Sequence, residues 1–229
     1  MSARTRYLRW GSTAEEVESG LPGDELLAHA DLTSTRAITI EAGADAVWPW
    51  IAQLGQGRGG FYSYDALENL VGCDIHSADR IVAACQSIEV GDVVSLHPDV
   101  GLVVAVVKRG RALVLRGAVP VAGAPAPYDS TWAFVLRERA DGTSRLVVRE
   151  RYGYVRRWAA ALIEPTALIS FVMTRRMLRG IKERAERAPR AVTPGARGAG
   201  GDVSAAKHRF RGLLRHAGRR WYGWRDRRS

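Results

Sequence analysis

The order in which hydrophobic periodicity changes along the chain restricts its fold more than any other feature. An alternating, strand-like pattern over Thr35–Ile40 is followed by helical spacing from Val47 to Leu54, and then by a second helical segment at Tyr64–Val71. Alternation then returns in five segments, which are Val93–His97, Leu102–Lys108, Ala112–Gly117, Ser130–Glu138 and Arg145–Tyr154. One long amphipathic pattern, roughly from Trp158 to Arg187, completes the series.

Short turns separate the later strands, which predicts antiparallel pairing of neighbours. Gly101, Arg109–Gly110 and Ala140–Gly142 mark the hairpins. We therefore predict an α+β protein of the helix-grip type, in which a curved antiparallel sheet wraps around the long C-terminal helix. A sheet bent in this way leaves space beneath it, and that space is the expected ligand cavity. The helix residues expected to form its apolar stripe are Ile163, Leu168, Phe171, Val172, Met177, Leu178 and Ile181.

Charge is distributed unevenly along the chain. The net charge is +10, but the segment from Pro189 to the end has eleven basic and two acidic residues, which leaves +1 for the preceding 188 residues. An electrostatic partner therefore belongs to the C-terminal segment. We predict an N-terminal arm at 1–34, a folded domain at 35–188, a flexible Pro/Gly/Ala-rich linker at 189–201 and a basic aromatic tail at 202–229.

Cysteine content and apolar run lengths indicate the compartment. The two cysteines, Cys73 and Cys85, cannot form a disulfide framework, and no apolar run follows Arg4 and Arg6 near the start. The longest apolar stretch, Trp158–Met173, is interrupted by Glu164 and Pro165 and is shorter than the ~20 residues of a membrane-spanning helix. These features predict a cytoplasmic protein.

Several motifs in the predicted domain resemble a known superfamily. They are Arg36–Ala42 with Ala46–Ile51, Gly57–Asp65, Asp74–Arg80, Thr131–Leu136 and Val147–Arg151. Together they resemble the START, polyketide-cyclase and pollen-allergen superfamily of helix-grip proteins (SRPBCC), with greatest similarity to uncharacterised actinobacterial members. The resemblance covers about two thirds of the chain, from Thr35 to Arg187. It implies the fold and an apolar ligand, but no catalytic residue, because the superfamily includes carriers, receptors and cyclases.

A glycine-rich segment at Gly55–Gly60 admits two interpretations. Phosphate-binding loops follow a strand and open a helix, whereas this segment follows a helix and lacks the Lys-Ser/Thr pair of a P-loop. The favoured interpretation is a loop that turns Phe61, Tyr62 and Tyr64 toward the cavity mouth.

The segment Cys73–Asp79 contains several potential metal ligands close together. Zinc prefers paired Cys or His residues with a second pair elsewhere, and neither Cys85 nor His97 supplies one. We therefore expect no metal and no cofactor. Asp74 or Asp79 is instead expected to bond backbone amides in a turn and to pair with Arg80. His76, at the rim of the cavity, is the best acid/base candidate of the segment.

Alternation on the last two strands assigns residues to the two faces of the sheet. Trp132, Phe134 and Leu136 face the cavity in one phase, and Thr131, Val135 and Arg137 face outward. In the next strand Leu146 and Val148 bring Glu150 and Tyr152 inward, with Arg149 and Arg151 outside. An inward Glu150 needs a partner such as an arginine or a tyrosine hydroxyl; the alternative is that it lies at the strand end in water.

Two functions are compatible with this arrangement. The favoured one is non-catalytic binding or transport of a hydrophobic small molecule such as a lipid, polyketide or isoprenoid. The alternative is a cyclase- or aromatase-like enzyme in which Glu150 and His76 transfer protons. The predicted ligand-binding residues are Phe61, Tyr62, Tyr64, Trp132, Phe134, Glu150, Tyr152 and Phe171.

The tail has a helical stripe surrounded by arginines. Phe210, Leu213, Leu214, Ala217, Trp221 and Trp224 fall on one helical face. An anionic membrane surface suits this pattern, contacted through Arg211, Arg215, Arg219, Arg220, Trp221 and Trp224. Under this interpretation, the cytoplasmic protein is expected to be peripheral at the inner membrane face. Docking onto the domain ranks equally, nucleic acid ranks lower, and disorder in the free protein stays open because three glycines interrupt the stripe.

Overall fold

The computed structural model describes residues 3–65, 69, 75–98, 100–119 and 124–187. The described helices are α1 (Ala3–Leu8), α2 (Ala14–Glu18), α3 (Ala44–Ala52) and α5 (Ala159–Ala185), with 3₁₀ turns η1 (Asp24–Leu27) and η2 (Ala83–Cys85). The strands are β1 (Leu32–Ile40), β2 (Val93–His97), β3 (Val100–Lys108), β4 (Ala112–Arg116), β5 (Tyr128–Glu138) and β6 (Ser144–Tyr154).

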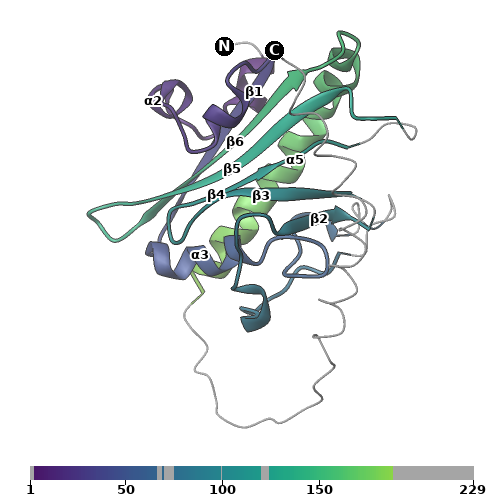
Figure 1. The fold of residues 1–229 in the computed structure, drawn as a ribbon. Coiled ribbons are helices and arrows are strands. Elements are labelled where there is room, and N and C mark those ends of the chain that lie inside the picture. Colours follow the sequence, from purple (N-terminus) through teal and green to yellow (C-terminus); the bar gives the residue numbers. More distant parts are fainter. Residues whose placement is uncertain (1–2, 66–68, 70–74, 99, 120–123, 188–229) are drawn as a thin grey trace. The chain divides into compact units, whose positions relative to one another are not determined.

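The strands form one antiparallel sheet in the order β1-β6-β5-β4-β3-β2, and α5 runs across one face of it (Figure 1). The strand pairing is irregular at two places, at Val104/Val106 between β3 and β4 and at Ser95/His97 between β2 and β3. Bulges of this kind bend a sheet. This is the helix-grip fold, as predicted. The strand predictions agree with the structure to within a few residues at each end.

The core lies between the sheet and the helices α3 and α5. It contains Ile51 and Leu54 from α3 and the loop after it, Phe134 and Val148 from the sheet, and Leu178 from α5, all nearly inaccessible to solvent. The predicted stripe of α5 is correct at Ile163, Met177, Leu178 and Ile181, which are buried. It is wrong at Leu168 and Val172, which are exposed, because the 100° step per residue places them on the far side of the helix.

The segment from residue 3 to residue 31 covers the outer face of the sheet and one edge. Ala37 of the edge strand β1 donates its backbone N–H to the carbonyl of Trp10 (3.0 Å), which protects an edge that would otherwise be open to pairing. Leu21 packs on Val135 and Val147 of the outer face. The expected outward direction of Val135 is thus confirmed, but the residue is buried because the N-terminal segment lies over it.

Predictions between residues 64 and 86 are only partly testable. Asp65 and Asn69 are helical, as predicted for Tyr64–Val71, and the remaining residues of that helix after Asp65 lie outside the described part. The expected short turn of helix at Ala78–Val82 is instead η2 at Ala83–Cys85.

Candidate functional site

Strand register brings one row of aromatic residues together on the inner face of the sheet. Tyr128 pairs with Tyr154, Ser130 with Tyr152, and Trp132 with Glu150, so these side chains share the face that α5 covers. The predicted alternation, with Trp132, Phe134 and Leu136 inward, agrees with their place in or against the main core cluster. We name Tyr128, Trp132, Tyr152 and Tyr154 the aromatic end of the inner face.

The inner face is filled at one end and accessible at the other. Phe134, Leu136, Leu146 and Val148 are buried. The four residues of the aromatic end are only partly buried. Tyr128, Tyr152 and Tyr154 pack against the buried cluster that contains Ile163 of α5, and Trp132 packs against the main core cluster. The aromatic end is therefore the less deeply buried part of the inner face.

Aromatic contacts give this end its shape. Trp132 stacks on Phe61 with 6.1 Å between ring centroids and contacts Phe134 at 4.8 Å, while Tyr128 and Tyr152 lie 5.9 Å apart. The Tyr128 hydroxyl accepts a hydrogen bond from the backbone N–H of Val119 (3.1 Å). These contacts form two groups of rings, one of Phe61, Trp132 and Phe134 and one of Tyr128 and Tyr152.

Two polar atoms of the aromatic end are buried and unsatisfied. The indole Nε1–H of Trp132 and the hydroxyl of Tyr154 have no hydrogen-bond partner among the described residues. A buried donor without a partner is costly, and native proteins seldom leave one unsatisfied. A bound molecule with hydrogen-bonding atoms would satisfy both groups.

Burial also fixes the protonation state of the tyrosines. Burial, and after it the negative charge of Glu150, raises the pKa of Tyr152, and burial raises the pKa of Tyr128. Both hydroxyls therefore stay protonated at neutral pH. They offer a ligand neutral O–H groups rather than a phenolate base.

Glu150 lies inward, as one of the two interpretations of the strand pattern predicted, and it is held in a buried ion pair. Its Oε1 lies 3.0 Å from Nη1 of Arg36, and the two side chains are 8% and 1% exposed. Ser170 donates to Glu150 Oε2 (2.6 Å), Thr174 donates to Oε1 (3.0 Å), and the Ser34 hydroxyl lies 3.4 Å from Oε2. Both carboxylate oxygens are thus occupied by protein groups.

Arg36 is a site residue that the sequence analysis did not single out. It donates from Nε to the carbonyl of Tyr7 (3.1 Å), and its guanidinium lies 5.8 Å from the ring of Phe171. Its position had a signal in the sequence: it shares the inward phase of β1 with Ile38 and Ile40. Ser170 and Thr174, four residues apart on one helical face, mark the matching polar position of α5.

The glycine-rich loop places its aromatic residues differently from the expectation. Phe61 and Tyr62 are buried in the core, and only Tyr64 is exposed. Tyr62 donates its hydroxyl to the carbonyl of Trp50 (3.1 Å) and has a left-handed φ of 56°. The loop closes on itself through a Gly55–Gly60 bridge, and Arg58 donates to the carbonyls of Ala52 and Cys85 at 2.9 and 2.7 Å.

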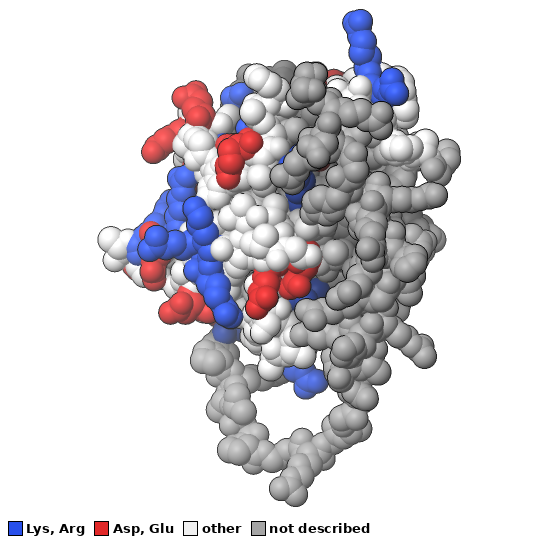
Figure 2. Space-filling view, viewed as in Figure 1, with Lys and Arg blue, Asp and Glu red and all other residues white. Residues whose placement is uncertain are grey.

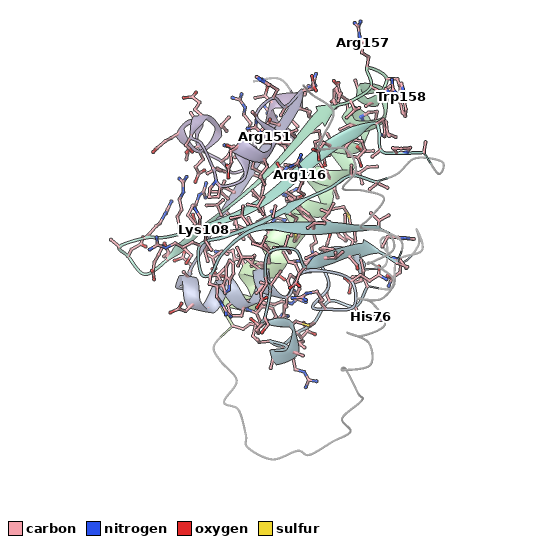
Figure 3. The ribbon with its side chains drawn as sticks, viewed as in Figure 1. His76, Lys108, Arg116, Arg151, Arg157 and Trp158 are labelled. Atoms are coloured by element: carbon pink, nitrogen blue, oxygen red, sulfur yellow. The ribbon has the colours of Figure 1, made fainter. Side chains whose placement is uncertain are left out.

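His76 and Glu150 have different surroundings. His76 is exposed in the segment after residue 74, and next to it Ser77 bonds to Asp65 (2.6 Å). Figure 3 places His76 at the end of the view opposite Arg157 and Trp158. The contacts of Glu150, by contrast, come from β1 and α5. The two acid/base candidates are therefore not arranged as one catalytic pair.

The potential metal ligands do not form a cluster in the described part of the chain. Asp79 pairs with Arg184 (3.0 Å) and Arg187 (3.8 Å) instead of Arg80. Among the residues that the structure describes, no group of three or more His, Cys, Asp or Glu side chains is placed to hold a metal ion. Cys73 and Asp74 lie outside the described residues.

A described pocket of about 290 Å³ lies on the outer face, not in the expected interior cavity. It is lined by polar residues that include Arg9, Glu18, Asp24, Thr35, Arg149 and Arg151. Arg149 is fully engaged there, with Asp24 at 2.6 Å and Thr35 at 3.0 Å. The pocket is an opening between the N-terminal segment and the sheet, and its polar lining does not suit an apolar ligand.

The tail residues Arg211, Arg215, Arg219, Arg220, Trp221 and Trp224 lie outside the described part of the chain. Their membrane contact stays a prediction. Within the part that the structure describes, none of the helices combines the length and apolarity of a membrane span.

Comparisons with known proteins give similarity in structure only. No family model and no curated protein matches the chain. A protein from Helicobacter pylori has 12% identity and a TM-score of 0.45, over 72% of this chain and 95% of its own. Norcoclaurine synthase from Thalictrum flavum has 11% identity and a TM-score of 0.42, over 69% and 87% of the two chains. A protein from Mesorhizobium loti has 15% identity and a TM-score of 0.40, over 69% and 98%. Similarities at this level carry no argument about what the chain does, and its fold is assigned from its own sheet and helices.

Proposed function

We propose that the chain binds an apolar small molecule with at least one hydrogen-bonding group, in the space between the aromatic end and the N-terminal half of α5, without transforming it. One observation carries the proposal: four inward-facing aromatic residues lie beneath a helix, stay partly exposed, and include two buried polar atoms without partners. Apolar and aromatic walls that carry a few polar atoms are typical of small-molecule sites. The ligand class is the one expected from the sequence, a lipid, polyketide or isoprenoid.

The chemistry of the site favours binding over catalysis. Glu150 has an arginine and three hydroxyl groups around its carboxylate, so a proton acceptor role would require breaking a buried ion pair. The raised pKa of Tyr152 keeps its hydroxyl protonated. The cyclase alternative has less support for this reason, although a hydroxyl donor such as Tyr154 still suits the orientation of a polar ligand.

The test uses a neutral fluorescent probe, N-phenyl-1-naphthylamine, with the full chain. We expect saturable binding that Trp132→Ala weakens by about tenfold or more, because the variant removes a large part of the apolar wall. Tyr64→Ala is the matched control, since Tyr64 is an exposed aromatic residue outside the aromatic end. Tyr154→Phe should leave probe binding intact, because the probe does not need the hydroxyl. The proposal fails if the wild-type chain does not bind the probe, or if Trp132→Ala and Tyr64→Ala behave alike.

A further inference from the structure

The first half of α5 exposes a continuous apolar face. Ile169 is 64% exposed and Trp158 at the N-terminal cap is 56% exposed. With the 100° step of a helix, these two residues fall within an arc of about 120° together with the other exposed apolar residues of this half. The α5 face comprises Trp158, Leu162, Pro165, Leu168, Ile169 and Val172.

This face is opposite the one that packs on the sheet. Ile163, Ala167 and Thr174 point inward and are buried, so the exposed residues are not needed to complete the core. Val155, in the turn before α5, is also exposed. Clusters of large exposed apolar side chains mark surfaces that bind another molecule or a membrane.

The segment that carries the α5 face is basic. Between residues 155 and 179 the chain has five arginines and one acidic residue, Glu164, and Arg176 pairs with Glu183 further along α5 (3.0 Å). Glu164 is engaged by Arg4 at 3.3 Å, so its charge is balanced. Arg156 and Arg157 are exposed and have no ion pair among the described residues. Figure 3 shows Arg157 and Trp158 at the N-terminal end of α5, and Figure 2 shows basic side chains projecting at the top of the same view.

The positive charge near the α5 face indicates which kind of partner it binds. A second copy of the chain would bring a second set of the same arginines to the contact. The segment from Pro189 onward carries a net charge of +9 and would also be repelled. A bilayer with anionic headgroups has the opposite charge, accepts apolar side chains below the headgroups, and favours tryptophan at its interface.

We propose that the α5 face docks on an anionic lipid bilayer, with the axis of α5 parallel to the membrane surface and Trp158 among the headgroups. The proposal goes beyond the ligand site and does not depend on it, since it uses the opposite side of the same helix. It assigns membrane contact to the folded domain rather than to the C-terminal tail.

The test is sedimentation of the full chain with vesicles of phosphatidylcholine and phosphatidylglycerol, and with vesicles of phosphatidylcholine alone. We expect binding to the anionic vesicles that weakens with salt, and much weaker binding to the neutral ones. The variant Ile169→Ser/Val172→Ser should lower the affinity about tenfold or more, because each residue inserts its side chain in the bilayer. Val90→Ser is the matched control, since Val90 is 66% exposed in a loop before β2.

Two further arms separate this proposal from its competitors. Trp221→Ala/Trp224→Ala removes the apolar anchors of the tail and should leave part of the vesicle binding in place. If it abolishes binding while Ile169→Ser/Val172→Ser does not, the tail is the membrane contact and the proposal is wrong. It is also wrong if the wild-type chain does not sediment with anionic vesicles. It is wrong as well if Ile169→Ser/Val172→Ser leaves vesicle binding unchanged and only converts a dimer to a monomer in analytical ultracentrifugation.

Discussion

At the scale of single residues, the interior of the fold depends on one charged pair. Arg36 and Glu150 face each other from neighbouring strands, and the hydroxyls of Ser170 and Thr174 from α5 complete the shell. A buried ion pair adds little stability compared with an apolar pair of similar volume, but a single unpaired partner is costly. We therefore expect the pair to contribute more to the register of α5 over β1 and β6 than to the stability.

The prediction at this scale concerns variants that remove one residue of the Arg36–Glu150 pair. Arg36→Met should lower the free energy of unfolding by about 3–5 kcal/mol, because Glu150 would be left buried without its cation. Arg36→Met/Glu150→Gln should cost clearly less than the sum of the two single variants. Urea unfolding followed by circular dichroism measures both. Asp129→Asn, which breaks the exposed Arg116–Asp129 pair, is the control and should cost about 0–1 kcal/mol. Strict additivity would show that Arg36 and Glu150 are not coupled.

At the scale of elements, strands were predictable because their alternation and hairpin turns are local signals. The strand β2 was predicted with its observed ends, Val93–His97, and β6 to within one residue. The faces of α5 were less predictable, because its first half is apolar on nearly all sides and only tertiary contacts decide which side is covered. The sequence shows Leu168 and Ile163 as equally apolar, yet only Ile163 meets the sheet.

A glycine in α5 gives the element-scale prediction. Gly180 lies inside the helix, where alanine ordinarily stabilises by about 1 kcal/mol. Here a Cβ atom would meet the backbone carbonyl of Tyr62 and lie 2.7 Å from its Cβ, so α5 could not keep its distance from this loop. We expect Gly180→Ala to lower the urea midpoint. Gly20→Ala, at a position with open space around it, should leave the midpoint nearly unchanged. A higher midpoint for Gly180→Ala would contradict the close packing of Tyr62 on α5.

At the scale of the whole described domain, the N-terminal segment proves to be part of the fold. The sequence suggested an extended arm before residue 35 because no hydrophobic period is sustained there. The structure instead ties it to the outer face through polar contacts that no periodicity reveals. Arg145 contacts Glu16 at 2.7 Å, and Arg149 contacts Asp24 at 2.6 Å. Such contacts join residues more than 120 positions apart in the chain, which explains why sequence patterns did not predict them.

This attachment should make the domain sensitive to acid. Burial acts to raise the pKa of Glu16, but the hydrogen bonds from Arg145 and from the backbone of Thr13, together with the positive charge of Arg145, outweigh it, so the pKa lies below its usual 4.5. A carboxyl group with a lowered pKa in the folded state adds stability above the pKa of the unfolded chain, and this contribution is lost as the pH falls through the folded value. Glu16→Gln should therefore lower the urea midpoint at about pH 7, and the difference from wild type should shrink toward about pH 3. Glu15→Gln, an exposed neighbour on α2, is the control and should shift the midpoint little at either pH. A difference between Glu16→Gln and wild type that stayed constant from neutral to acid pH would show that the ionised carboxylate does not hold the N-terminal segment on the sheet.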